Sequence, residues 1–290
     1  MPVEPSRADI TVEKGRSVMA GSALVLGPGG PVGTAWMAGL AGGLRREGVD
    51  LGAAGRIVGT SAGAIVGAVL ASGGDLGRLA ALPAPAGLGG RVRTDPDRLA
   101  EVLATLGDPG LERAEALRRV GRLAVTASTG PQEAAIARMR FLIGAAEWPG
   151  RPLLIPSVDA ETGEAVIWGR RGAASLPEAV AASTAFPATA PPITIDGRRY
   201  IDGALRAGTN VDLAGDASVV IVVEPMAHAY GTSSTPAGPR VVIRLVPDAN
   251  AIEALGPDMT DLTAWVPAYQ SGLRQAPDAA QRIRACTAAM

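Results

Sequence analysis

Short apolar runs that end in glycine-containing turns recur along the chain and predict strands buried in a sheet. Residues 23–26 and 56–58 are the first two such runs, and each passes through a glycine-rich turn into an apolar helical stretch. Residues 218–224 and 240–246 are continuous β-branched runs, which are typical of strands covered on both faces. The pattern therefore predicts an α/β fold.

Helical patterns and hairpins alternate in the middle of the chain. Helices are predicted over residues 97–106, 111–127, 131–146 and 175–183, and hairpins over residues 152–168 and 193–201. The first three helices make residues 95–148 a candidate helical insert, either a cap beside a site or ordinary packing helices. Helices that begin near Ala249, Leu262 and Asp278 are expected to finish the chain.

A change of pattern near residue 20 predicts the domain organisation. Residues 1–20 are polar and lack periodicity, so we expect them to form a flexible leader. Residues 21–290 contain no internal repeat and no obvious linker, and 47% of the chain is hydrophobic, which is ample material for a core. We therefore predict a single domain after the leader.

The second glycine-rich turn, Gly59-Thr60-Ser61-Ala62-Gly63, joins a predicted strand to a predicted helix. A G-x-S-x-G turn of this kind holds its serine on a strained corner, and the two glycines remove side chains that would collide with neighbouring elements. Ser61 would then stand at a helix N-terminus, where free backbone N–H groups favour developing negative charge. Ser61 is the candidate nucleophile, although a tight turn with a capping serine gives the same pattern.

The first glycine-rich turn, over residues 27–33, can supply complementary donors. A carbonyl attacked by a serine becomes an oxyanion, which unpaired backbone N–H groups can bind. The two prolines of this turn have no N–H to offer. The candidate oxyanion-hole donors are therefore Gly29 and Gly30, with Gly33 as a third.

Composition excludes several classes of function. The net charge is −1 and no basic run is present, which disfavours a nucleic-acid binder. Cys286 is the only cysteine and His228 the only histidine, so we expect no intramolecular disulfide and no metal cluster of thiolates or imidazoles. No cofactor is expected either. The absence of a cysteine pair favours a reducing, cytoplasmic compartment.

Residues 19–44 carry no charge and raise the question of a membrane span or signal peptide. Glycines and prolines interrupt this stretch at its middle, and the residues before it mix acidic and basic side chains. We therefore prefer a buried strand followed by a buried helix. Peripheral contact with the inner membrane face is left open.

A third motif, Asp202-Gly203, follows the hairpin near residue 200. The order of the three motifs, a glycine-rich loop, G-x-S-x-G and Asp-Gly, resembles the patatin-like phospholipase family of acyl hydrolases. Residues 158–163, residues 181–187 and Asn210 are also similar to the family. The resemblance runs from about residue 23 to about residue 246, which is most of the chain.

The resemblance implies a three-layer α/β/α fold with a mostly parallel sheet and a Ser–Asp dyad. Ser61 would be the nucleophile and Asp202 the general base, acting on lipid or acyl-ester substrates through an acyl-enzyme intermediate. A carboxyl group with a reference pKa near ~3.9 is a poor base for a serine hydroxyl in water, so the site must raise that pKa. The apolar and aromatic neighbours of Asp202 in the sequence fit this need.

Three positions depart from the family pattern. Val32 stands where an arginine is common, Pro28 replaces a glycine, and Ala204 follows Asp202-Gly203 where a second glycine is common. These departures bear on the substrate class more than on the fold or the dyad.

Two alternative functions fit parts of the sequence. A Ser–His–Asp α/β-hydrolase would use Ser61, Asp202 and His228, which occur in that chain order. Only one strand is predicted before the strand that leads into the G-x-S-x-G turn, however, whereas several precede that turn in the α/β-hydrolase fold. The other alternative is a patatin-fold protein that binds a lipid or a partner without turnover.

Overall fold

The computed structural model describes residues 21–81, 94–127, 129–235, 238 and 241–288. The predicted leader over residues 1–20 lies outside this described part.

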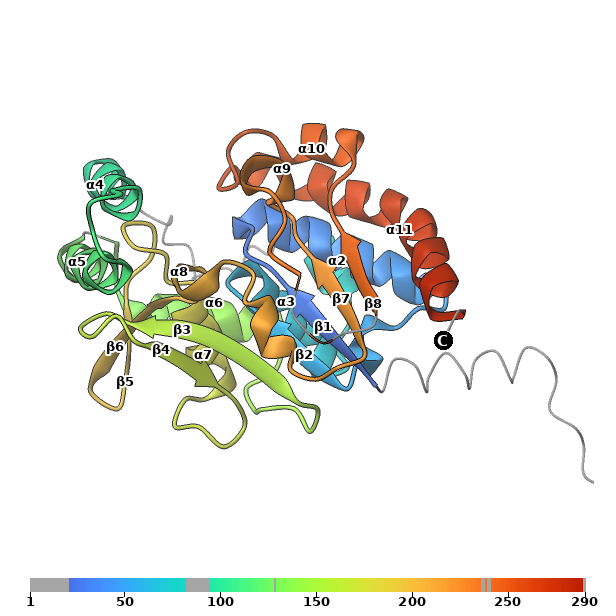
Figure 1. The fold of residues 1–290 in the computed structure, drawn as a ribbon, viewed down its shortest axis with the longest axis horizontal. Helices are drawn as coiled ribbons and strands as arrows, with labels where there is room; N and C mark the ends of the chain where they lie inside the picture. The colour runs from blue at the N-terminus through green and yellow to red at the C-terminus, as the bar shows by residue number, and fades with distance from the viewer. Residues whose placement is uncertain (1–20, 82–93, 128, 236–237, 239–240, 289–290) are drawn as a thin grey trace, which may run out of the picture.

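A mixed sheet forms the centre of the molecule (Figure 1). In the described part of the chain its strand order is β5-β6-β3-β2-β1-β7-β8, with β4 paired to β3. The bounds are Ser22–Leu26 (β1), Arg56–Gly59 (β2), Leu153–Asp159 (β3), Ala165–Trp168 (β4), Ile193–Ile195 (β5), Arg198–Asp202 (β6), Val219–Val223 (β7) and Val241–Leu245 (β8). From β8 to β3 neighbouring strands pair in parallel, whereas β4, β5 and β6 pair antiparallel.

The alternation of side chains along the strands supplies two cores, one on each face of the sheet. In β1, Leu24 and Leu26 face the larger core, and Ala23 and Val25 face the other side. The larger core is covered by α2 (Gly30–Arg46), α3 (Ala62–Ala71), α6 (Gln132–Ile143), α7 (Leu176–Ser183), α10 (Ala249–Leu255) and α11 (Trp265–Ala288). The predicted α/β/α fold with a mostly parallel sheet is therefore confirmed.

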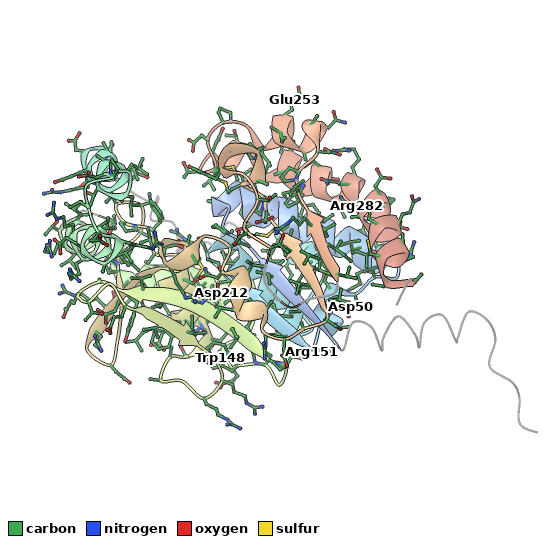
Figure 2. The ribbon with its side chains drawn as sticks, viewed as in Figure 1. Asp50, Trp148, Arg151, Asp212, Glu253 and Arg282 are labelled. Atoms are coloured by element: carbon green, nitrogen blue, oxygen red, sulfur yellow. The ribbon has the colours of Figure 1, made fainter. Side chains whose placement is uncertain are left out.

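The opposite face is covered by a thinner layer. It contains α4 (Pro96–Leu106), α5 (Arg113–Thr126), α8 (Ala204–Ala207) and the 3-10 helix η3 (Val211–Ala214). The remaining short helices are α9 (Ala227–Tyr230), η1 (Leu51–Ala53), η2 (Leu76–Leu79) and η4 (Leu262–Ala264). Charged side chains such as Glu253 and Arg282 lie on the outer surface of the larger layer (Figure 2). Among the described residues, no helix combines the length and the apolarity needed to cross a bilayer.

The three helices predicted within residues 95–148 are present, but they belong to different layers. Met139 of α6 lies in the larger core beneath the sheet. Val102 of α4 and Val120 of α5 instead pack on the opposite face, against Val158 and Ile201. The α4–α5 pair therefore forms a separate hairpin at one end of the molecule (Figure 1).

The C-terminal helix α11 is continuous, whereas the sequence predicted separate helices from Leu262 and from Asp278. Pro277 suggests such a break, because a proline inside a helix costs about 3 kcal/mol. Beyond it, however, Ala279, Ala280 and Ile283 are buried. Burial of one isoleucine side chain alone contributes about 1.5–3 kcal/mol, so packing of this final segment offsets the cost of the proline.

Glycines allow α2 and α11 to pack with their backbones in close contact. A Cβ atom on Gly39 would overlap the Tyr269 carbonyl, and a Cβ on Gly272 would overlap the Trp36 carbonyl. Because a backbone carbonyl cannot move aside as a flexible side chain can, these positions require glycine.

We expect Gly39→Ala to lower the free energy of unfolding by about 1–3 kcal/mol, because the added methyl group overpacks the α2–α11 contact. Gly42→Ala is the matched control on the same helix, since its Cβ would lie 3.7 Å from the Tyr269 hydroxyl oxygen, an ordinary van der Waals distance. That variant should be neutral or gain up to about 1 kcal/mol from helix propensity. Urea unfolding of both variants measures the difference, and equal stabilities would contradict the packing argument.

Candidate active site

The topology brings the carboxyl ends of two strands together. β2 pairs with the start of β3 through Val58 and Leu154, in parallel, and β6 pairs antiparallel with the end of β3 through Asp202 and Ser157. Because β2 and β6 run in opposite directions along β3, their carboxyl ends approach each other. Ser61, just beyond β2, therefore lies beside Asp202, the last residue of β6.

Ser61 occupies a strained corner between β2 and α3. Its backbone has φ 53° and ψ −117°, a conformation that residues other than glycine rarely adopt. A Cβ on Gly59 would collide with the Gly63 carbonyl, and a Cβ on Gly63 would collide with the Leu26 carbonyl. The two glycines of the predicted elbow thus allow the close approach of backbone segments that holds Ser61 at this corner, where it is only 9% exposed.

The Ser61 hydroxyl donates a hydrogen bond of 2.8 Å from Oγ to Asp202 Oδ2. The other carboxyl oxygen, Asp202 Oδ1, accepts the Ala204 N–H at 2.8 Å. Asp202 is only 1% exposed, and this burial raises its pKa to about 7, although both hydrogen bonds act to lower it. The next residue, Gly203, must be glycine, because a Cβ there would overlap the Pro156 carbonyl.

The glycine-rich turn packs against the serine elbow through backbone hydrogen bonds. Thr60 N–H donates to Leu26 O at 3.0 Å, and Gly63 N–H donates to Gly27 O at 3.2 Å. Among the described residues, the N–H groups of Gly29 and Gly30 donate to no protein acceptor. These two amides therefore remain the candidate oxyanion donors.

Two features of this turn refine the sequence prediction. Gly33 lies inside α2, and its N–H donates to Gly29 O at 2.8 Å, so it is not free to bind an oxyanion. The candidate donors therefore narrow to Gly29 and Gly30. Val32, at the position where the family commonly has an arginine, is fully buried and its N–H donates to Met259 O at 3.3 Å.

His228 does not take part in the hydroxyl–carboxylate contact. It lies exposed on the short helix α9, and the Ser61 hydroxyl bonds directly to Asp202 without an intervening imidazole. The arrangement therefore does not support the Ser–His–Asp alternative. Within the described ranges, no three His, Cys, Asp or Glu side chains form a group that could hold a metal ion.

Ser183 is a site residue to which the sequence analysis gave no role. Its Oγ accepts the Ser61 N–H at 3.0 Å, and its carbonyl accepts the Gly203 N–H at 3.3 Å. Ser183 thus contacts both Ser61 and Gly203, the residue after Asp202. The signal in the sequence was its place within residues 181–187, one of the segments similar to the family.

We expect Asp202→Asn to make the protein more stable than wild type at pH 8. The unfolded carboxyl has an ordinary pKa of 3.8 and the folded one about 7, so stability falls as the pH rises through this interval and the buried group loses its proton. Asparagine carries no charge and avoids this loss, which is on the order of a few kcal/mol. Thermal unfolding should show a clear gain at pH 8 and a smaller one at pH 5.

Asp212→Asn is the control with the opposite sign. The hydrogen bond from Arg206 lowers the pKa of Asp212, so its charge stabilises the folded state at pH 8. This variant should therefore not gain stability at pH 8. If Asp202→Asn were less stable than wild type at pH 8, the conclusion that the ionised Asp202 destabilises the folded protein would be wrong.

Comparison with known proteins identifies the family. The sequence matches the family model of patatin-like phospholipases over residues 24–214. Among solved structures, VipD from Legionella pneumophila aligns with a TM-score of 0.44 and 13% identity, over 90% of this chain and 66% of that one. The type III effector protein ExoU aligns with a TM-score of 0.34 and 16% identity, over 89% of this chain and 53% of that one.

Comparison with curated proteins gave no match. This chain spans less than two thirds of the length of VipD and of ExoU. The family match, in contrast, covers more than half of this chain and includes both Ser61 and Asp202. This protein therefore belongs to the patatin-like phospholipase family.

Proposed function

We propose that this protein is a serine acyl hydrolase that cleaves carboxylic esters of lipids or lipid-like molecules. The observation that carries the proposal is the 2.8 Å hydrogen bond from Ser61 Oγ to Asp202 Oδ2, together with the rise in the pKa of Asp202 to about 7. A carboxylate with this pKa is a stronger base than one in water and is still substantially ionised at neutral pH. The lipid character of the substrate rests on the family.

In the first half of the proposed reaction, Asp202 takes the hydroxyl proton of Ser61 as Oγ attacks the ester carbonyl carbon. The carbonyl oxygen becomes an oxyanion, which the N–H groups of Gly29 and Gly30 stabilise. When the intermediate collapses, the bond to the leaving alcohol breaks and Asp202 returns the proton to the alcohol oxygen. The acyl group is then held on Ser61.

In the second half, Asp202 takes a proton from a water molecule, and the resulting hydroxide attacks the acyl carbonyl carbon. The same two glycine amides stabilise the second oxyanion. Collapse breaks the bond between Ser61 Oγ and the acyl carbon, and the proton on Asp202 moves to Oγ. The products are a carboxylic acid and the free enzyme, so one water molecule is consumed for each ester cleaved.

Hydrolysis of a panel of p-nitrophenyl acyl esters tests the dyad. We expect Ser61→Ala and Asp202→Asn to lose activity by at least about 10³-fold, because each removes a group that acts on the reacting atoms. His228→Ala is the control and should retain wild-type kcat/KM, since His228 is exposed on α9. The chain-length preference of the wild type would then define the acyl group.

A fluorophosphonate probe provides a second measurement that does not depend on the choice of ester. It should label the wild type and His228→Ala but not Ser61→Ala. Loss of activity in His228→Ala would overturn the Ser–Asp mechanism. A folded wild type that cleaves no ester and takes up no probe would favour the alternative of a lipid- or partner-binding protein.

The pH dependence of kcat/KM tests the role of Asp202 as a base. Only the ionised carboxylate can accept the Ser61 proton, so kcat/KM should fall about tenfold for each pH unit below the pKa of about 7 and level off above it. Measurement between about pH 5 and pH 9 with a substrate whose leaving group does not titrate in this range gives the profile. A profile that is flat down to pH 5 would contradict a buried base with a raised pKa.

A further inference from the structure

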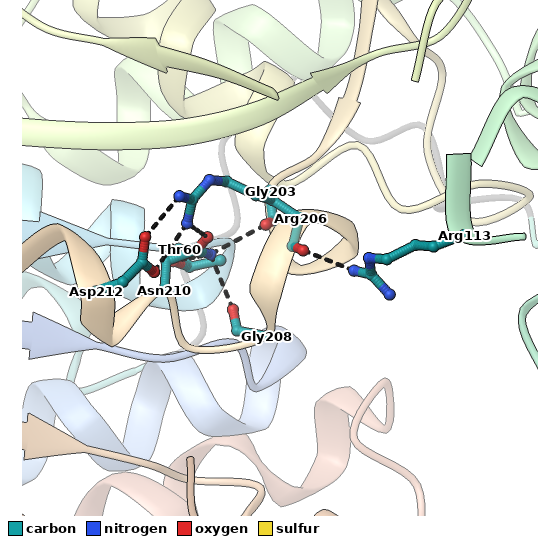
Figure 3. Close-up of polar contacts among 7 residues, drawn as sticks. All are labelled: Thr60, Arg113, Gly203, Arg206, Gly208, Asn210 and Asp212. Carbon is teal, nitrogen blue, oxygen red and sulfur yellow. Dashed lines mark hydrogen bonds and ion pairs between the residues drawn. The ribbon is translucent and has the colours of Figure 1, made fainter. Parts of the chain in front are cut away.

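The side-chain amide of Asn210 lies between the two halves of the proposed dyad. Its Nδ2 is 3.1 Å from Thr60 Oγ1 and 3.0 Å from Gly203 O (Figure 3). Thr60 directly precedes Ser61, and Gly203 directly follows Asp202. One amide group therefore contacts the serine elbow and the aspartate turn, which are far apart in the sequence.

We propose that Asn210 is a positioning residue that sets the separation between Ser61 Oγ and Asp202 Oδ2. The proposal rests on the proposed function, because it concerns the geometry of the same two groups. It assigns Asn210 no contact with the substrate, since the side chain is fully buried.

The orientation of the amide is fixed by its other contacts. Arg206 Nη1 lies 2.8 Å from Asn210 Oδ1, and a guanidinium can only donate, so the amide oxygen must face it. On the other side, the carbonyl groups of Gly203 and Gly208 can only accept, so Nδ2 must face them. A flipped amide would therefore place acceptor against acceptor and donor against donor.

Arg206 is itself held from two directions. Its guanidinium pairs with Asp212, with N–O distances of 2.6 and 2.9 Å. Its carbonyl accepts from Arg113 Nη2 of α5 at 2.6 Å (Figure 3). The same nitrogen also donates to Leu205 O. Helix α5 thus contacts α8, the helix whose Arg206 orients the Asn210 amide.

The backbone of Asn210 explains why this residue type suits the position. Its φ of 57° and ψ of 39° lie in the left-handed region, which asparagine and aspartate tolerate better than other side chains do. Its N–H donates to Ala207 O, and its carbonyl accepts from Leu213 N–H, both at 3.1 Å. The Cα position is therefore fixed, and the side chain has little freedom to drift.

Asn210→Asp is the sharpest variant for a test. Aspartate has the same shape, tolerates the left-handed backbone and keeps an oxygen toward Arg206. It replaces the donor Nδ2 with an acceptor that faces the Gly203 carbonyl. We expect kcat to fall about 10²-fold, the loss typical of a displacement near 1 Å at reacting groups. KM should stay near the wild-type value, because Asn210 does not contact the substrate.

The readout is kcat per active site, counted by the end point of fluorophosphonate labelling, so that unfolded protein does not contribute. The rate of labelling should fall with kcat while the end point is reached. Val211→Ala is the matched control, since it truncates the adjacent buried residue and leaves the amide intact. It should lower Tm but keep wild-type kcat per active site.

Thr60→Val decides the question if Asn210→Asp does not fold. Valine retains the branched shape of threonine but lacks the Oγ1 acceptor for Asn210, so kcat should fall with KM unchanged. Wild-type kcat in Asn210→Asp, or in Thr60→Val where the first variant is unfolded, would overturn the positioning role while leaving the proposed hydrolase intact.

Two further outcomes separate this proposal from the proposed function. A wild type that takes up the probe but cleaves none of the esters still allows the test, and a slower labelling rate in Asn210→Asp would then support the positioning role. A wild type that neither cleaves esters nor takes up the probe would overturn both proposals together.

Discussion

The buried Asp202 carboxylate is the constraint on which the rest of the site depends. A carboxylate removed from water is costly unless it is hydrogen-bonded, and this one has the Ala204 N–H and the Ser61 hydroxyl as partners. Each of these hydrogen bonds lowers the pKa of Asp202, but burial raises it by more than the two bonds together lower it. The site therefore leaves the carboxylate incompletely compensated, and this same deficit makes it a stronger base. The packed helical layers have to supply the stability that the charge removes.

Close approach of backbone segments is the second requirement, and glycine meets it at each junction. The elbow needs glycine at Gly59 and Gly63, and the turn after Asp202 needs it at Gly203, because a Cβ at any of these positions would overlap a backbone carbonyl oxygen. Ser61 cannot be glycine and holds a strained conformation instead. The Ser183 hydroxyl and the Gly27 carbonyl accept hydrogen bonds from the elbow, so neighbouring elements hold the strained corner in place.

The sequence predicted those features that depend on local chemistry. Strands and the elbow glycines follow from apolar periodicity and from the sterics of a tight turn, whereas the pairing of Ser61 with Asp202 entered only through the resemblance to a family. Tertiary packing decided the rest. Gly33 appeared free until the start of α2 placed its N–H inside the helix. The separate helix predicted from Asp278 instead continues the preceding one through Pro277, because the residues beyond this proline are buried in the core. No periodicity could assign Ser183 or Asn210 their contacts, because those depend on how distant turns meet.

Ser183, the last residue of α7, and Asn210, just before η3, hold the Gly203 peptide from both sides. Its N–H bonds to the Ser183 carbonyl and its own carbonyl accepts from Asn210 Nδ2, while the same two residues hold the Ser61 N–H and the Thr60 hydroxyl. In the proposed reaction, a base that gains its strength from burial has no water to correct a poor alignment, so the distance from Asp202 Oδ2 to Ser61 Oγ must be set by the protein. Ser183 and Asn210 belong to two separate segments of the chain, so together they restrain that distance from both sides.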